Sequence, residues 1–273
     1  MQKKGIFTII VLFFISVGYK GQRHEIGVQL GMSNLVGDIG RTNYILQKPT
    51  RNTADYGIPF YGGILYRMNF NPYQTLRLNV GYSHIQFIDA LAKEEYRRNR
   101  KLWGTNSIVE ADLIFEYNFF PVNDAQKSML SPYLFGGLGA MLASTPQLIV
   151  ENDLVTSPTY SSGKEVTMAI PFGVGLKYKF NYNWALFGEF MFRPTFSDTI
   201  DYSVIDENNV KVIYNKDFEG SKTKEDPYKT IAEARITKLI EERQIGNINS
   251  KDWVNTATLG LSYSFGRPPC YCE

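Results

Sequence analysis

The segment from Asn255 to Phe265 constrains the fold of this chain most strongly, because two kinds of side chain alternate along it without a break. One set is apolar and ends in two aromatics: Ala257, Leu259, Leu261, Tyr263 and Phe265. The other set is small and polar: Thr256, Thr258, Gly260, Ser262 and Ser264. An apolar face backed by a polar one is typical of a membrane-barrel strand, where lipid surrounds the sheet and the interior is polar. The pattern therefore predicts a terminal barrel strand.

The same period of two recurs along the chain and predicts eight strands in all. They span 24–32, 59–70, 76–83, 109–119, 132–143, 168–180, 184–193 and 255–265. The connections are short at 71–74, 121–131 and 181–183, and long at 33–58, 87–106, 144–165 and 194–254. This alternation predicts an all-β fold, an eight-stranded antiparallel transmembrane β-barrel with short periplasmic turns and long extracellular loops.

A soluble antiparallel sandwich or a lipocalin-like barrel also alternates, but it keeps its apolar face inward and needs no aromatics at its strand ends. In this sequence, aromatics fall at the predicted periplasmic strand ends: Phe70, Phe119, Phe120, Phe180, Trp184 and Phe265. Aromatic girdles at both interfaces are a feature of outer-membrane barrels. A closed barrel also satisfies every backbone donor and acceptor in lipid, which an open sheet does not.

The start of the chain has the pattern of a secretory signal. Two lysines precede an apolar run from Gly5 to Gly18, which is too short to cross a bilayer as a helix but fits a signal-peptide core. We expect cleavage after Gly21, with Gly18 as the alternative. The expected regions are a signal peptide (1–21), a barrel (22–265) and a periplasmic C-terminal tail (266–273). Loss of the signal turns the formal net charge of +2 into −1, so overall charge does not indicate nucleic acid binding.

Ten charged residues share the inward parity of the predicted strands, five of each sign. The acids are Glu25, Glu110, Asp112, Glu116 and Glu189, and the bases are Arg67, Arg77, Lys177, Lys179 and Arg193. An eight-stranded barrel is just wide enough to be filled by side chains, and charges taken out of bulk water are tolerated when they are paired. We expect a self-neutralising network that fills the lumen. An ion or substrate path is the alternative.

Signals for catalysis and metal binding are weak. The only histidines in the sequence are His24 and His84. Both fall on the face of their strand that carries the apolar side chains, where a reacting group would point towards lipid or headgroups. Cys270 and Cys272 supply two soft ligands, without a second Cys/His pair nearby to complete a tetrahedral zinc site. We expect no catalytic residue, no metal, no cofactor and no enzymatic activity.

The last long connection carries the pattern of an amphipathic helix near 227–245. Asp226 can cap this helix with Pro227 at its first position, and Gly246 can end it. The apolar face of such a helix has to pack on the barrel mouth, on lipid or on a partner. Covering the mouth and docking a partner are the two interpretations that the sequence leaves open.

Several motifs resemble those of the PorG family. They are Gln22 to Gly27, Gly37-Asp38-Ile39-Gly40, Asn118 to Pro121, Ser131 to Gly139, Gly246-Asn247 with Asp252-Trp253, and Phe265 to Cys272. The resemblance covers most of the mature chain, and the C-terminal motif is its most specific part. It implies an outer-membrane barrel of the Bacteroidota type IX secretion system, associated with a periplasmic ring of the lipoprotein PorK and its partner PorN. The insertion around 204–245 departs from the family pattern, so no role carries over to it.

The strand pattern and the resemblance together predict a non-enzymatic protein of the cell outer membrane. We expect an adaptor or assembly component of a type IX protein secretion apparatus, which meets outer membrane lipid and PorK/PorN-like ring proteins and binds no nucleic acid. Docking is expected at the tail, through Arg267, Pro268, Pro269, Cys270, Tyr271 and Cys272. An oxidising periplasm permits an intermolecular disulfide through Cys270 or Cys272. The alternatives are a strained, exchangeable bridge between these two cysteines and a frayed terminus with incidental thiols. The other classes are a small outer-membrane lipid-modifying enzyme and a generic structural barrel or narrow pore.

Overall fold

A computed structural model describes residues 23–45, 57–124, 128–151, 159–205, 210–213, 237–238, 240–242, 244–247 and 250–266. One sheet holds its ten strands, which are β1 (Arg23–Val36), β2 (Phe60–Asn69), β3 (Gln74–Ile88), β4 (Trp103–Asn118), β5 (Met129–Glu151), β6 (Thr159–Ala169), β7 (Phe172–Lys179), β8 (Trp184–Pro194), β9 (Val210–Ile213) and β10 (Trp253–Phe265). Two short helical segments, η2 (Asp89–Leu91) and α3 (Glu95–Arg100), follow β3. Within these ranges no helix is long and apolar enough to cross a bilayer. The expected signal peptide (1–21) and tail residues 267–273 lie outside them.

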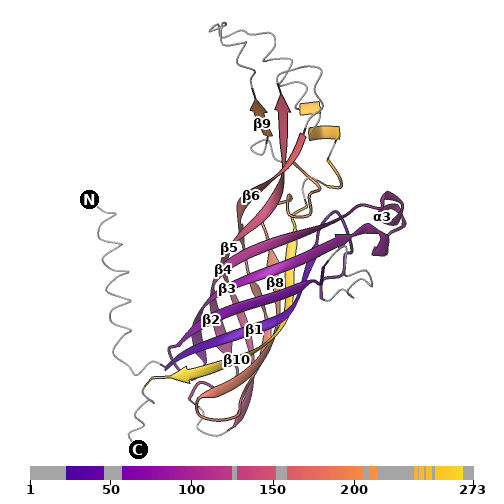
Figure 1. Cartoon of the computed structure of the whole chain (residues 1–273). Helices are drawn as coiled ribbons and strands as arrows, with labels where there is room; N and C mark the ends of the chain where they lie inside the picture. The colour runs from indigo at the N-terminus through magenta and orange to yellow at the C-terminus, as the bar shows by residue number, and fades with distance from the viewer. Residues whose placement is uncertain are drawn as a thin grey trace, which may run out of the picture.

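Eight of the strands pair in a closed antiparallel ring. The order is β1, β2, β3, β4, β5, β7, β8 and β10, and β10 pairs back with β1 from His24↔Phe265 to Val36↔Trp253. Figure 1 shows these strands tilted around a common axis. A closed ring has no open sheet edge, so the backbone of its wall satisfies its own hydrogen bonds.

The expected strand at 168–180 is wrong as a single element, because the structure divides it into β6 and β7. Pro171 lies in the break and has no N–H to contribute to a ladder. The Pro171 carbonyl still accepts a hydrogen bond from Gly137 N at 2.8 Å. β5 bridges the break, since it pairs with β7 along its first part and with β6 along its second. β6 is therefore an additional strand outside the ring, and with β9 it brings the whole sheet to ten strands.

The long loop expected at 144–165 is also wrong, because most of it is strand. β5 continues to Glu151 and β6 begins at Thr159, and the two form a hairpin that rises beyond the ring (Figure 1). β9, from the last long connection, pairs in parallel with β5 between Leu148↔Val210 and Glu151↔Ile213. The sequence Ser161-Ser162-Gly163 has no apolar alternation, which is why its strand is not recognisable from the sequence.

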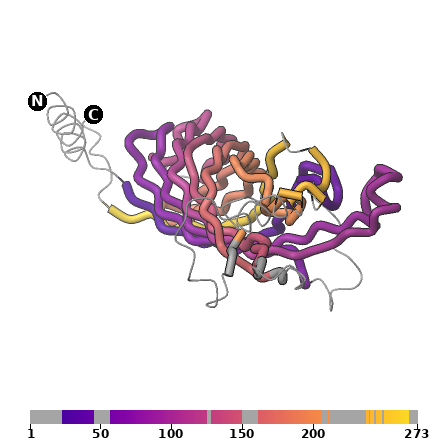
Figure 2. Tube along the Cα trace, turned by 90° about the horizontal axis from the view of Figure 1, so that it is seen from above, coloured from indigo at the N-terminus to yellow at the C-terminus, as the bar shows by residue number. Residues whose placement is uncertain are grey.

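The remaining long connections differ from expectation mainly in length. β3 runs to Ile88 and β4 begins at Trp103, so the connection expected at 87–106 is 89–102 and contains η2 and α3. This hairpin, with α3 at its tip, extends away from the ring (Figures 1 and 2). Of the helix expected at 227–245, residues 237–238 and 240–242 are helical. Gly246 follows with a positive φ of 84°, which suits a residue beyond a helix end. Asp226 and the expected first half of the helix lie outside the described residues.

The outside of the ring is apolar and the inside is polar. On β10, Leu259 is 75% exposed while Ser262 is fully buried, and on β3, Leu78 is 50% exposed while Arg77 is fully buried. A soluble barrel shows the reverse arrangement. On β4 the apolar side chains run from Val109 to Tyr117, which matches the roughly 9 residues that a tilted strand needs to cross hydrocarbon.

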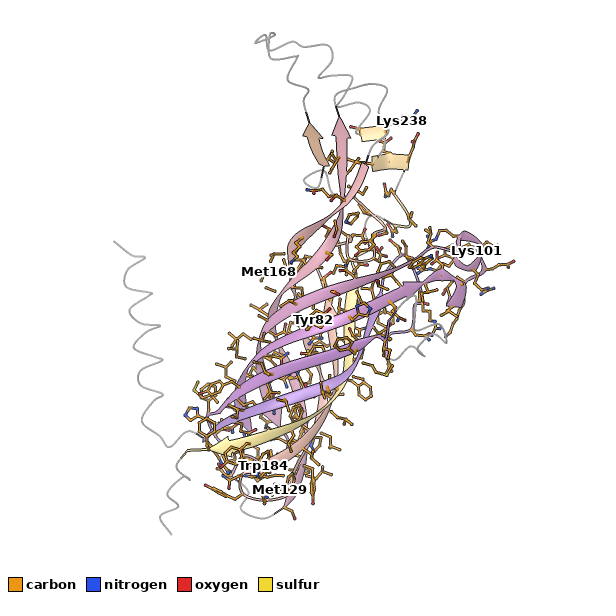
Figure 3. All side chains as sticks on the ribbon, viewed as in Figure 1. Tyr82, Lys101, Met129, Met168, Trp184 and Lys238 are labelled. Carbon is orange, nitrogen blue, oxygen red and sulfur yellow. The ribbon has the colours of Figure 1, made fainter. Side chains whose placement is uncertain are left out.

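Aromatic side chains gather at both ends of this apolar band. At the end with the short turns, Trp184 packs against Tyr263 with ring centroids 5.0 Å apart, and His24 stacks on Phe265 at 5.8 Å. At the other end, Phe172 stacks on Phe192 at 5.7 Å. Figure 3 labels Trp184 near the short turns, with Lys101 and Lys238 beyond the opposite rim. Two such girdles mark the interfaces of a membrane.

Candidate functional site

All ten charged residues of the predicted lumen network lie inside the ring, and each is at most 3% exposed. Four of them form a closed square of alternating charge. Arg67 Nε lies 3.0 Å from Glu116 Oε1, and Arg67 Nη2 lies 3.2 Å from Glu189 Oε1. Arg77 binds the same two carboxylates, with Glu116 at 2.9 Å. We call Arg67, Glu116, Arg77 and Glu189 the charge square.

Aromatic rings enclose the charge square and complete its contacts. Tyr133 donates its hydroxyl hydrogen to Glu189. The Arg67 guanidinium lies over the Phe187 ring at 4.4 Å, and that of Arg77 lies over the Phe135 ring at 4.9 Å. Such stacking stabilises a desolvated cation in addition to its ion pairs. The square is therefore packed on its flanks.

A second group of ion pairs lies further along the axis, towards the long connections. Arg193 contacts Glu110, and its Nε lies 3.4 Å from Asp112 Oδ2. Asn79 donates to the same Asp112 oxygen at 3.3 Å, and Gln29 donates to Asn79 Oδ1 at 2.6 Å. Neutral side chains thus connect the charges and occupy the space between opposite walls.

The end with the short turns is closed by a side chain that the sequence reasoning missed. Asn123, in the turn between β4 and β5, is 1% exposed and reaches into the ring. Its Oδ1 accepts from Lys177 Nζ at 3.2 Å, and its Nδ2 donates to Thr75 Oγ1 at 3.1 Å. Lys177 also binds both Glu25 oxygens, at 2.8 and 2.9 Å. A lone asparagine in a turn carries no sequence signal for such a role.

The expected pairing of Lys179 with a carboxylate is not seen in the described residues. Lys179 Nζ donates instead to the main-chain oxygen of Asn123 at 3.2 Å. Arg23, a further buried cation that the sequence analysis does not include, donates to the same oxygen at 3.0 Å and stacks over Tyr182 at 3.9 Å. Arg23 has the parity of Glu25, so period-two alternation could have identified it.

The opposite end is closed by residues 195–205, which we call the cap segment. This segment follows β8 and folds back into the mouth of the ring. Ile200 joins a buried apolar cluster that includes Leu35, Phe87 and Val254. Asn106 of β4 donates to Ile200 O at 2.8 Å, and Tyr202 packs edge-on against Phe87 at 5.3 Å. The interior is therefore charged in its middle and apolar below the cap segment.

The turn Gly37-Asp38-Ile39-Gly40 is the point where the connections at this end meet. Asp201 of the cap segment accepts from Ile39 N at 2.8 Å, and Asp89 accepts from Gly40 N at 2.8 Å. Arg97 of α3 donates to Gly37 O and Gly40 O, both at 3.0 Å. Asp38 accepts from Asn247 N at 3.1 Å and from Ser250 Oγ at 3.0 Å. One turn therefore joins the segments after β1, β3 and β8 to the approach to β10.

Neither histidine lies in a catalytic arrangement that the described contacts define. His24 Nδ1 shares a hydrogen bond with Tyr66 at 2.6 Å near the short turns. His84 Nδ1 lies 3.4 Å from Ser107 Oγ, and Tyr82 donates to this oxygen at 2.9 Å. The described residues contain no group of three His, Cys, Asp or Glu side chains that could hold a metal ion. The six tail residues expected to dock a partner, Arg267 to Cys272, lie outside the described residues.

Comparison with solved structures returns small outer-membrane proteins. The N-terminal β-barrel domain of OprF from Pseudomonas aeruginosa is 13% identical, with a TM-score of 0.36 over 90% of this chain and 98% of that one. Ail of Yersinia pestis, solved with the heparin analogue sucrose octasulfate, is 12% identical, with a TM-score of 0.41 over 90% and 99%. A major outer membrane protein from Thermus thermophilus is 13% identical, with a TM-score of 0.40 over 89% and 99%. No curated protein matches the sequence.

The chain has the fold of outer-membrane β-barrels. Its strands pair in an antiparallel ring, its exterior is apolar, and its interior is filled and charged. The chain belongs to the family described as "Domain of unknown function (DUF6089)", whose model matches residues 3–228 and 207–273.

Proposed function

We propose that this chain is an eight-stranded outer-membrane β-barrel that acts, without enzymatic activity, as an adaptor or assembly component of a type IX protein secretion apparatus. The observation that carries the proposal is the closed interior. The charge square fills the middle of the ring, Asn123 closes one end and the cap segment closes the other. A barrel filled in this way offers partners its rims and its outer wall rather than a passage.

The resemblance to the PorG family indicates which secretion apparatus the chain belongs to. Contacts at the mouth of the ring support this resemblance. Three of the motifs quoted for that resemblance are far apart in sequence: 37–40, 246–247 and 252–253. In the structure, Asp38 binds Asn247 N, and Asp252 and the 37–40 turn both bind the cap segment. The motifs are therefore parts of one built feature. The alternative of a narrow pore predicts ion conductance in a planar bilayer, whereas the adaptor predicts none.

The proposal fixes the sidedness of the barrel, with short turns in the periplasm and long connections outside the cell. We expect an impermeant thiol reagent on intact cells to label Lys238→Cys, a position whose side chain is 75% exposed. It should not label Asn183→Cys in the turn between β7 and β8, which serves as the matched control. Both variants are made with Cys270 and Cys272 replaced by serine. Labelling of Asn183→Cys alone would invert the barrel and contradict the proposal.

The tail is proposed to dock the periplasmic ring, with Cys270 or Cys272 forming a link to a partner. Affinity isolation from native membranes should recover ring proteins resembling PorK and PorN with the parent chain. Deletion of 267–273 should reduce this recovery at least about tenfold, equivalent to a loss of about 1.4 kcal/mol of binding free energy. Non-reducing electrophoresis should show a heavier species that is lost in Cys270→Ser or Cys272→Ser.

Two controls make this experiment decisive. Lys101→Ser, at the opposite rim, should leave recovery of the ring unchanged (Figure 3). Each variant should also show the heat-modifiable migration of a folded barrel. If deletion of the tail and both cysteine substitutions leave recovery and secretion at the parent level, docking through the tail is wrong, and a terminus with incidental thiols is the better interpretation.

A further inference from the structure

Three aspartates at the mouth of the ring belong to neither the charge square nor its neighbours. They are Asp198 and Asp201, both in the cap segment, and Asp252, just before β10. Asp252 is fully buried, and its Oδ2 accepts from Ile200 N at 2.9 Å and from Asp201 N at 3.3 Å. Its Oδ1 has no hydrogen-bond partner among the described residues. A buried carboxylate oxygen without a partner is costly while it carries charge.

Two of these carboxylates converge on Gly37. A Cβ at this position would collide with both Asp252 Oδ1 and Asp201 Oδ2, so the two oxygens approach the same α-carbon. Asp198 is 6% exposed, and its Oδ2 also lacks a partner among the described residues. Like charges held this close in a buried site repel one another unless something neutralises them.

Within the part of the chain that the structure describes, the charged groups around the cluster make no ion pair with it. Arg97 of α3 donates to Gly37 O and Gly40 O. Arg100 forms its ion pair with Asp89, and its charge also attracts Asp201 without direct contact in the described residues. Glu165 of β6 accepts from Thr199 of the cap segment, and Asp38 after β1 adds further negative charge. Lys251 favours ionisation of Asp198 without an ion pair in the described residues.

A proton is the simplest neutralising species at this cluster. The described residues contain no group of three acidic, His or Cys side chains arranged for a metal. Burial, and then repulsion by Asp201 and Asp38, raises the pKa of Asp198 to about 7. Burial likewise raises the pKa of Asp201, and it raises the pKa of Asp252 well above its ordinary value. The closed mouth therefore favours the protonated carboxyls.

We propose that the cap segment is a pH-sensitive latch, seated in the mouth while these carboxyls are protonated and released by charge repulsion when they ionise. The sign follows from the raised pKa values. The protonated form stabilises the closed mouth fully below the ordinary aspartate pKa, and this stabilisation is lost as the pH rises through about 7. The latch would change the surface shown outside the cell, and it does not depend on the secretion role.

The test measures access to the cap segment in the full chain, folded in lipid nanodiscs. Ile200→Cys, at a position only 1% exposed, is compared with the exposed Lys238→Cys, both with Cys270 and Cys272 replaced by serine. The ratio of their thiol-labelling rates removes the intrinsic pH dependence of the reagent. We expect the labelling rate of Ile200→Cys, divided by that of Lys238→Cys, to rise at least about tenfold between about pH 5.5 and about pH 8.5. A difference of one pKa unit between the closed and the released state changes their equilibrium about tenfold.

Asparagine variants identify the responsible groups, because an amide resembles the protonated acid. Asp252→Asn and, independently, Asp198→Asn should keep the ratio low across this range, while Asp124→Asn in the turn between β4 and β5 should rise like the parent. Should Asp252→Asn fail to fold, Asp198→Asn decides alone. If the labelling ratio of the parent does not change with pH, the latch is wrong. The latch is also wrong if Asp252→Asn and Asp198→Asn both fold and their ratios rise as much as that of the parent. If added calcium ions abolish the rise of the labelling ratio, a metal ion rather than a proton neutralises the cluster. That outcome also contradicts the latch.

Discussion

Replacing Glu189 with alanine should lower the free energy of unfolding by about 3–5 kcal/mol, the usual effect of removing one partner from a buried ion pair. Glu189 binds both Arg67 and Arg77, and it accepts from Tyr133. Its loss leaves two fully buried guanidinium groups sharing the Glu116 carboxylate. Urea unfolding in vesicles, followed by heat-modifiable migration, would measure the change.

Two further variants separate charge from simple truncation. Glu242→Ala removes an exposed carboxylate that pairs with Lys238 at 3.7 Å, and it should change stability by at most about 0.5 kcal/mol. Glu189→Ala combined with Arg77→Met removes one charge of each sign from the charge square and should recover part of the loss. Equal stability of Glu189→Ala and the parent would mean that water already reaches the square, which would support a pore.

Leu259→Arg should destabilise the protein by about 2–4 kcal/mol, the cost of a cation on the lipid face near the bilayer midplane. Leu259 lies within β10 and is 75% exposed, so in a water-soluble protein this change would be nearly neutral. Unfolding from vesicles of defined lipid composition measures the difference. Leu91→Arg is the matched control, because Leu91 is 42% exposed but lies in η2, in the connection between β3 and β4 that extends away from the ring.

The control should lose at most about 0.5 kcal/mol, as expected at an exposed site outside lipid. Similar losses in the two variants would show that the exposed face of β10 does not meet hydrocarbon. Such a result would contradict the membrane position while leaving the ring of strands intact.

Alternation with a period of two was enough to predict the wall of the ring and the direction of its side chains. Parity placed Arg67, Arg77 and Arg193 inside, and the structure finds each of them fully buried. The signal is strong because lipid and a polar interior impose opposite demands on successive residues. The partners of each ion pair in the lumen were harder to predict from the sequence. A contact such as that of Arg67 with Glu189 joins strands that are not neighbours in the ring.

The features that the sequence did not reveal depend on tertiary contacts. Ser161 to Gly163 form strand because β5 offers an edge, although their own pattern is neutral. The cap segment mixes polar and apolar residues without a regular period, and its burial depends on Asp252, just before β10, and on Asn106 of β4. Asn123 likewise acquires its role from lysines of β7. Local composition contains no information about such partners.

The charge square also has a consequence for how the protein enters a membrane. Its members come from β2, β3, β4 and β8, so the last carboxylate is supplied by a strand made long after the first arginine. An incomplete ring would present unmatched guanidinium groups to hydrocarbon, which is strongly unfavourable. We therefore expect insertion strand by strand to be unfavourable, and we expect the wall to close while its inner face is still hydrated. The net charge of the charge square reaches zero only when β8 has joined β2, β3 and β4.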